Sequence, residues 1–210
     1  MEHVAPIPHA AETSTGLPSR KLLIWAFLGS ECMFFGSLIA TYLVYQGKSL
    51  IGPFPKDVLD IPVTSVSTFV LLTSSLGMVL AYAGITRGDV WAFRRWILLT
   101  ALLGITFLGF QAFEFYHFAN PVYENGELIR QGLTPRTNLF GSTFFTLTGF
   151  HGAHVTVGVI WLLSLFAYSF RGDLTREGAL NVDLAALYWH FVDIVWVVIF
   201  PVVYLIGVQP

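Results

Sequence analysis

Five runs of mainly apolar residues, each long enough to cross a lipid bilayer, constrain this 210-residue chain more than any other feature. A helix crosses a hydrocarbon core of about 30 Å with roughly 20 residues. Only 11% of the residues are charged, whereas soluble domains carry about 25%. We therefore predict an all-α, polytopic membrane protein whose five transmembrane helices form a bundle. The predicted spans are residues 22–45, 63–86, 96–118, 139–170 and 184–207.

The chain outside and between these spans offers few other signals. Residues 1–19 contain three prolines and no apolar stretch, so we predict a flexible tail there instead of a signal peptide. Residues 20–210 are then one transmembrane domain. The single cysteine, Cys32, leaves no internal disulfide, and no basic run indicates binding to nucleic acid.

The distribution of basic residues predicts how the chain lies in the membrane. Seven Lys and Arg residues fall on the N-terminal side of the predicted topology, and four fall on the opposite side. Basic residues favour the cytoplasmic side. We therefore predict a cytoplasmic N-terminus, an external C-terminus and an external loop at 119–138.

Ionisable residues within the spans are the candidate functional groups, because a charge at bilayer depth costs at least a few kcal/mol. From the helical rise of about 1.5 Å per residue, four of them fall at a similar depth: Glu31, His154, His190 and Asp193. His151 shares a helix face with His154. We predict that these five form a buried polar network, and that Glu114 and His117 form a second polar pair near the outer end of the third span. The full set within the spans is Glu31, Glu114, His117, His151, His154, His190 and Asp193.

Three interpretations of this network compete. His154 and His190 could ligate a haem from facing helices, or Glu31 and Asp193 could mark a proton or ion pathway. The third interpretation, which we favour, is a network whose acids and imidazoles satisfy one another and fix the register of the helices.

Four segments resemble subunit III of the haem-copper terminal oxidases. The two longest are GSTFFTLTGFHGAHVTVG (141–158) and ALYWHFVDIVWVVIFPVVYL (186–205). FLGFQAFEFYHF (107–118) and LGSECMFFGS (28–37) are also similar to that family, including the position of each glutamate. The similarity covers essentially all of residues 20–208.

The resemblance implies a non-catalytic subunit of a respiratory oxidase. Such a subunit binds no haem, copper or other cofactor of its own, except for structural phospholipid. It packs against subunit I, which holds the haems and copper that reduce oxygen to water, and lies in the same complex as subunit II. It stabilises subunit I and supports proton uptake. Glu31 matches the family's buried glutamate, so a proton-relay role for Glu31 is the alternative to a structural one.

This chain departs from the longer members of that family, whose seven spans include two that are absent here. The short form resembles bacterial versions, which implies a multi-pass protein of the bacterial plasma membrane. We favour cytochrome c as the electron donor of the complex, with a quinol as the alternative. A free-standing transporter or scaffold is the remaining possibility. Arg171, after the fourth span, is a candidate contact for a lipid phosphate, although we favour the simpler interpretation, an arginine that follows the positive-inside rule.

Overall fold

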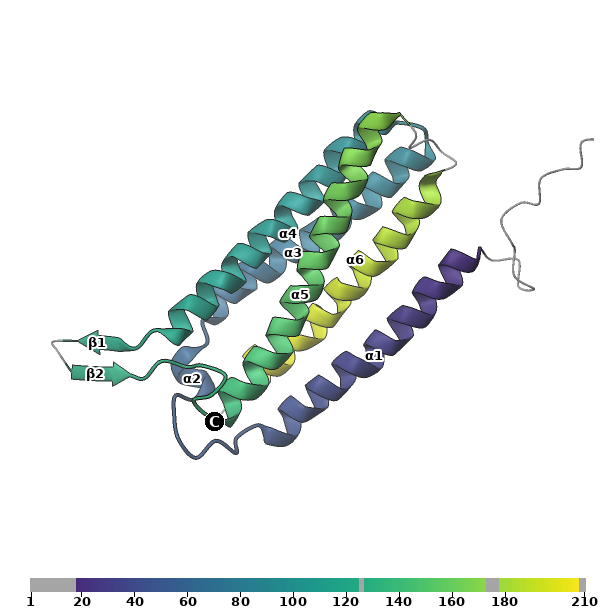
Figure 1. Ribbon diagram of the computed structural model, residues 1–210. Helices are drawn as coiled ribbons and strands as arrows, with labels where there is room; N and C mark the ends of the chain where they lie inside the picture. The colour runs from purple at the N-terminus through teal and green to yellow at the C-terminus, as the bar shows by residue number, and fades with distance from the viewer. Residues whose placement is uncertain (1–17, 125–126, 173–177, 208–210) are drawn as a thin grey trace, which may run out of the picture.

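The computed structural model describes residues 18–124, 127–172 and 178–207, and all five predicted spans are helices in it. They run along one another with a small hairpin projecting from one end (Figure 1). Of the tail predicted over residues 1–19, residues 1–17 lie outside the described ranges, and Ser19 is the first residue of α1. The membrane-spanning elements are α1 (Ser19–Tyr45), α3 (Ile61–Thr86), α4 (Val90–Ala119), α5 (Leu139–Tyr168), which continues into η1 (Ser169–Arg171), and α6 (Ala179–Phe200), which continues into η3 (Pro201–Ile206).

Capping side chains set where three of these helices begin. The carboxylate of Asp60 accepts from the backbone N–H of Val63 at the start of α3, and Asp89 accepts from Ala92 at the start of α4. Asn138 caps α5 in the same way. Such caps satisfy backbone donors that the first turn of a helix leaves without partners. Helix α4 therefore begins six residues before the predicted span, which was placed by apolar composition alone.

The all-α fold is confirmed, and the loops also contain two short elements that the five predicted spans did not include. One is α2 (Pro55–Val58). The other is an antiparallel hairpin of β1 (Val122–Glu124) and β2 (Glu127–Arg130), in which Val122 pairs with Arg130 and Glu124 with Glu127. The sequence contained a signal for the hairpin, because Asn-Gly at positions 125–126 is a typical hairpin-turn pair. We call this end of the molecule the hairpin end and the opposite end, where α1 begins, the N-terminal end.

Four of the five long helices form a closed ring. Helix α3 packs against α4, α4 against α5, α5 against α6, and α6 against α3. Helix α1 lies outside this ring, on the edge formed by α5 and α6 (Figure 1). Lys21 of α1 forms a 2.7 Å ion pair with Asp183 of α6 at the N-terminal end, and Gln46 Nε2 donates to the carbonyl of Ile206 at the hairpin end.

Trp189 of α6 is one side chain that contacts the three other helices of the ring. Its indole fits against Gly104 of α4 and Gly158 of α5, where an added Cβ would lie 2.6 Å and 2.8 Å from ring carbons. Its Nε1 donates to Ser74 Oγ of α3 at 3.1 Å. The indole of Trp189 fits between α4 and α5 because Gly104 and Gly158 have no side chain.

The last six residues of the fifth span form a π-helix instead of an α-helix. Pro201 has no N–H to donate, and the chain from Pro201 to Ile206 follows a wider turn. This confirms that the span continues through Pro201. It also buries Tyr204, which belongs to a polar cluster described below.

We expect Gly104→Ala to lower the midpoint of thermal unfolding of the detergent-purified protein. The new methyl group would overlap the Trp189 ring, and overpacking of this kind typically costs about 1–3 kcal/mol. Gly109→Ala is the matched control, because it adds the same methyl group to the same helix at a position with no heavy atom within 4 Å. Equal midpoints for the two variants would contradict this account of the packing.

Candidate functional site

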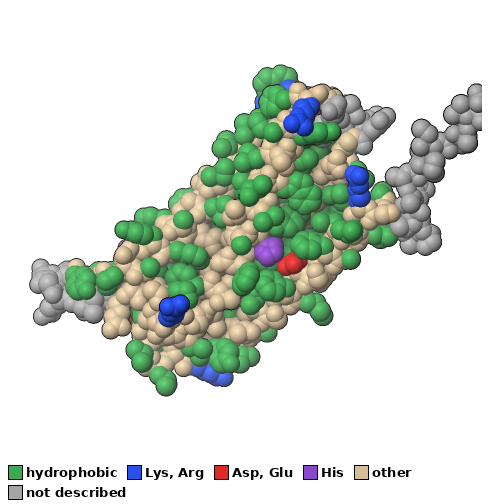
Figure 2. Space-filling view, in the orientation of Figure 1, with side chains coloured by type: hydrophobic (Ala, Val, Ile, Leu, Met, Phe, Trp, Pro, Cys, Tyr) green, Lys and Arg blue, Asp and Glu red, His purple; other side chains and the backbone are tan. Residues whose placement is uncertain are grey.

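Glu31 and His154 form a polar contact between α1 and α5, halfway along the molecule. Glu31 Oε2 lies 3.3 Å from His154 Nε2, and both side chains are less than one-fifth exposed. Figure 2 shows a histidine next to an acidic side chain on the face where α5 and α1 lie side by side. The structure therefore brings together two of the five residues of the predicted network.

The other nitrogen of His154 determines what this contact can hold. Nδ1 lies 2.8 Å from the carbonyl oxygen of Phe150, and a carbonyl can only accept, so Nδ1 carries a hydrogen. If neither Nε2 nor the Glu31 carboxyl carried a proton, two hydrogen-bond acceptors would face each other at this contact. A proton on one of the two groups would therefore allow a hydrogen bond between α1 and α5 at this contact.

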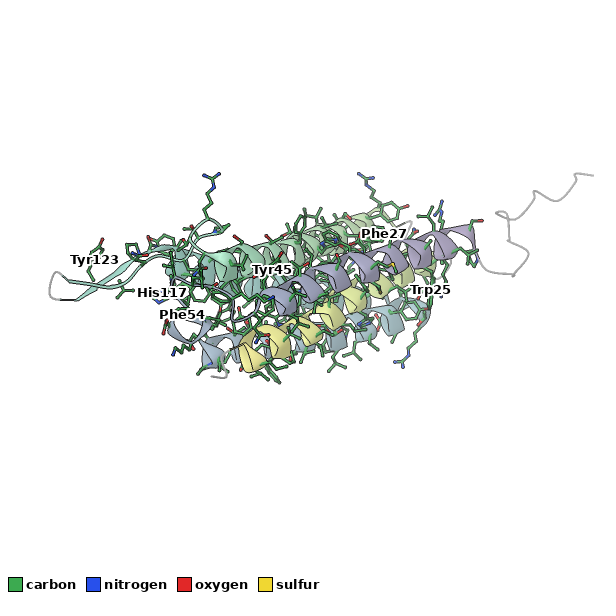
Figure 3. All side chains as sticks on the ribbon, turned by 90° about the horizontal axis from the view of Figure 1, so that it is seen from below. Trp25, Phe27, Tyr45, Phe54, His117 and Tyr123 are labelled. Carbon is green, nitrogen blue, oxygen red and sulfur yellow. The ribbon has the colours of Figure 1, made fainter. Side chains whose placement is uncertain are left out.

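Aromatic side chains surround this pair. Phe35 of α1 meets the His154 ring edge-on at 5.0 Å between centroids. The hydroxyl of Tyr188 donates to the carbonyl of His154 at 3.0 Å, and the Tyr188 ring stacks on Phe27. A groove of about 450 Å³ runs beside the pair, between α1 and α5, and Phe27, Trp161 and Tyr188 are among the residues that line it. Phe27 and Trp25 mark this part of α1 in Figure 3.

His190 and Asp193 belong to a separate cluster on the interface of α6 with α3. Ser75 Oγ of α3 lies 2.6 Å from His190 Nδ1, and the carboxyl of Asp193 lies near the same Ser75 side chain. Asp193 is buried, and its Oδ1 has no hydrogen-bond partner among the described residues. If His190 Nδ1 donates to Ser75 Oγ, the Ser75 hydroxyl keeps its own hydrogen for another acceptor, and the Asp193 carboxyl is nearby.

The structure places the four residues predicted to form a single layer in two groups, Glu31 with His154 and His190 with Asp193. The depth estimate did not include the direction in which each side chain leaves its helix. Tyr188 of α6 faces α1 and α5, and His190, two residues later, lies about 200° further around the helix. His190 consequently points toward α3. The structure does not bring His154 and His190 together as the haem interpretation required.

His151 lies one turn before His154 but is enclosed within the ring. It is fully buried, and its ring lies against Trp196 of α6 and Phe107 of α4, with centroids 4.8 Å and 5.7 Å away. Its Nε2 donates to the carbonyl of Val192 at 3.2 Å, whereas Nδ1 has no hydrogen-bond partner among the described residues. His151 therefore forms a third contact between α5 and α6, in addition to Trp189 with Gly158 and Tyr188 with His154.

Glu114 forms the most completely satisfied cluster, nearer the hairpin end. Thr64 of α3 donates to Oε1 at 2.7 Å, and Tyr204 of η3 donates to Oε2 at 2.9 Å. Glu114 is buried, whereas its predicted companion His117 is exposed and stacks on Phe113. Figure 3 shows His117 at the hairpin end, where it and Phe54 line the same open pocket.

Sequence reasoning missed the hydroxyl groups that serve these acids and imidazoles. Ser75, Thr64 and Tyr204 each complete a cluster, and Thr68 accepts from Trp196 Nε1 in a similar bond between α3 and α6. Serine and threonine are common in apolar spans because their hydroxyls can bond to the backbone of their own helix, and tyrosine is common there because its ring is largely apolar. Nothing in the sequence therefore distinguished these four from the other hydroxyl residues of the spans.

The remaining predicted site residue, Arg171, is exposed and ends η1 at the N-terminal end. That position fits both a lipid-phosphate contact and an ordinary basic flank of a span. Among residues 18–124, 127–172 and 178–207, no three His, Cys, Asp or Glu side chains gather in a way that could hold a metal ion.

We expect Ser75→Ala to destabilise the detergent-purified protein more than Ser65→Ala does. Without the Ser75 hydroxyl, His190 Nδ1 and Asp193 lose the side chain between them, and a buried group left without its partner costs about 1–3 kcal/mol. Ser65 is on the same helix, but it is exposed and bonds only to the backbone of Ile61. The measurement is the midpoint of thermal unfolding, and an equal midpoint for both variants would contradict the cluster.

Comparison with known proteins is consistent across the length of the chain. A family model described as cytochrome c oxidase subunit III matches residues 9–208. Cytochrome c oxidase subunit 3 of Alkalihalophilus pseudofirmus is 37% identical over 95% of this chain and 98% of that protein. Quinol oxidase subunit 3 of Bacillus spizizenii is 33% identical over 99% and 98% of the two chains. Cytochrome bo(3) ubiquinol oxidase subunit 3 of Pseudomonas aeruginosa is 38% identical over 87% and 83%.

Proposed function

This chain belongs to the cytochrome c oxidase subunit III family, and we propose that it is the non-catalytic third subunit of a proton-pumping haem-copper terminal oxidase. In this role it packs against subunit I, and lies in the same complex as subunit II, while subunit I reduces oxygen to water. The match of the family model to residues 9–208 carries the proposal. The five apolar helices make the chain a multi-pass membrane protein, and the bacterial relatives favour the plasma membrane. The excess of basic residues on the N-terminal side supports a cytoplasmic N-terminus.

The polar contacts of the bundle support a bracing role. Several acids and imidazoles within the spans contact side chains of other helices, as in Glu31–His154, Ser75–His190 and Thr64–Glu114–Tyr204. Each contact joins two elements that are distant in the sequence. A subunit fastened in this way offers a rigid lateral surface to a neighbour in the membrane. In our proposal the haems and copper belong to partner subunits, and this chain holds only structural phospholipid.

The electron donor is proposed as cytochrome c, with a quinol as the alternative. The similar proteins carry names of both kinds, cytochrome c oxidase and quinol oxidase subunits 3, at comparable identity. The donor binds to other chains of such a complex, so nothing in the spans of this chain distinguishes the two.

Purification of the tagged chain from its native membranes in a mild detergent tests the proposed complex and its donor. We expect haem-containing subunits to co-purify, the optical spectrum to show haem a, and the complex to oxidise reduced cytochrome c. Oxidation of a quinol instead would support the alternative donor. A chain that purifies alone without haem absorbance would contradict the complex and favour a free-standing transporter or scaffold. A preparation from cells with the untagged chain is the control.

Glu31 has two proposed roles, which substitution by glutamine separates. The amide of Glu31→Gln can donate to His154 Nε2, so the contact between α1 and α5 is kept. The variant has no ionisable proton at this position. Under the bracing role we expect Glu31→Gln to assemble and to pump the normal number of protons per electron, and Glu31→Leu to weaken assembly. Proton release by the reconstituted oxidase and subunit retention during purification are the measurements. A lower proton yield in Glu31→Gln with normal assembly would favour the relay role.

A further inference from the structure

We propose that the groove at the N-terminal end between α4 and α5 binds the phosphate and glycerol region of an acidic phospholipid. The groove has a volume of about 270 Å³. Its lining combines cationic and apolar side chains, namely Trp91, Arg94, Arg95, Leu98, Phe166 and Phe170. The site is separate from the polar clusters within the bundle, and it does not depend on the proposed oxidase role.

Arg94 is the fixed wall of this groove. Its Nε donates to Ser169 Oγ at 3.0 Å, and Nη2 donates to the carbonyl of Ser169 at 2.6 Å, where α5 ends. Its guanidinium also lies 4.3 Å from the centre of the Phe170 ring. These contacts hold the guanidinium plane in one orientation and leave Nη1 for an anionic ligand. Arginine is well suited to this task because its rigid fork matches the geometry of phosphate oxygens.

Arg95 is the adaptable wall. It is exposed, and its guanidinium lies 5.4 Å from the centre of the Trp91 ring. Among the residues that the structure describes, no carboxylate lies within 4 Å of Arg94 or Arg95. No carboxylate of the described part of the chain therefore neutralises the two positive charges of the groove, and a bound anion would do so.

The surface beyond the groove fits the rest of a lipid. Leu98, Leu102 and Ile105 follow Arg95 along one stripe of α4 at intervals of three or four residues, and the side chains of Leu102 and Ile105 are about half exposed. Acyl chains can lie along this stripe while the phosphate stays between the arginines. A free phosphate ion would use the two arginines but would leave the apolar walls without a partner, so the groove favours a phospholipid.

The location of the groove is also appropriate for a lipid headgroup. It lies where α4 begins and α5 ends, and Figure 2 shows basic side chains around this end of the bundle. Each basic residue close to a membrane surface strengthens the attraction of acidic lipids. Trp91 is 71% exposed, and tryptophan is enriched at the depth of the headgroups. Arg171, the phosphate contact predicted from the sequence, does not line this groove.

Photo-crosslinking of the intact complex tests the site. The purified complex is delipidated, incubated with phosphatidylglycerol that carries a photoreactive group near its glycerol, and irradiated, and labelled peptides of this chain are then quantified. We expect label on the segments 91–98 and 166–170. Arg95→Gln should reduce this labelling about fivefold at a subsaturating lipid concentration, the effect of one basic residue at a membrane surface. Arg87→Gln removes an equal charge from an exposed position at the same end and should leave the labelling unchanged.

Three results would overturn the proposal. Equal labelling by a phosphatidylcholine probe would show that the groove takes acyl chains without regard to charge. An equal loss in Arg87→Gln would show a general attraction to the basic end instead of a site. Displacement of the lipid by inorganic phosphate in the wild-type complex would show a site for free anions. The phosphatidylcholine probe and the displacement by inorganic phosphate need no variant, so they decide the question even if Arg95→Gln fails to assemble.

Discussion

The hydrocarbon core of the membrane imposes the constraint on which this structure depends: a polar group there must find its partner within the protein. An acid or imidazole that faced lipid would cost several kcal/mol, whereas one that is paired inside a bundle can be held. Polar side chains in the spans meet this constraint by hydrogen bonds between helices, such as those that Glu114 accepts from Thr64 and Tyr204. The same bonds that remove the cost of burial also fix which helices are neighbours and at what depth they meet.

Apolar packing and polar pairing act together in the ring of α3 to α6. Trp189 fills the space left by Gly104 and Gly158 and also bonds to Ser74. His151 combines a bond to the carbonyl of Val192 with ring contacts to Trp196 and Phe107. Lipid tails are as apolar as leucine, so apolar burial alone gives helices little reason to associate in a membrane, and close packing and hydrogen bonds supply the specificity.

Much of the fold could be predicted from the sequence, because the length of an apolar run directly reports a membrane span. All five spans are present as predicted, and Pro201 does not end the fifth. The candidate site was predicted less well. Depth along a helix follows from counting residues, and it correctly placed Glu31 opposite His154. The direction of a side chain around the helix depends on which neighbour each face meets, and the sequence did not contain that information for His190 and Asp193. The hydroxyl partners Ser75 and Thr64 were missed because serine and threonine need no partner beyond their own backbone.

The placement of α1 outside the ring has a consequence for biosynthesis. This helix is the first to be translated, yet the surface that receives it consists of α5 and α6, which are the last. The partners of Lys21 and Glu31 are Asp183 and His154, more than a hundred residues downstream. Before α5 and α6 are inserted, Glu31 and Lys21 of α1 do not have the partners His154 and Asp183 that they contact in the complete structure. The full set of contacts that hold α1 can therefore form only after α6, the last helix, has been synthesised.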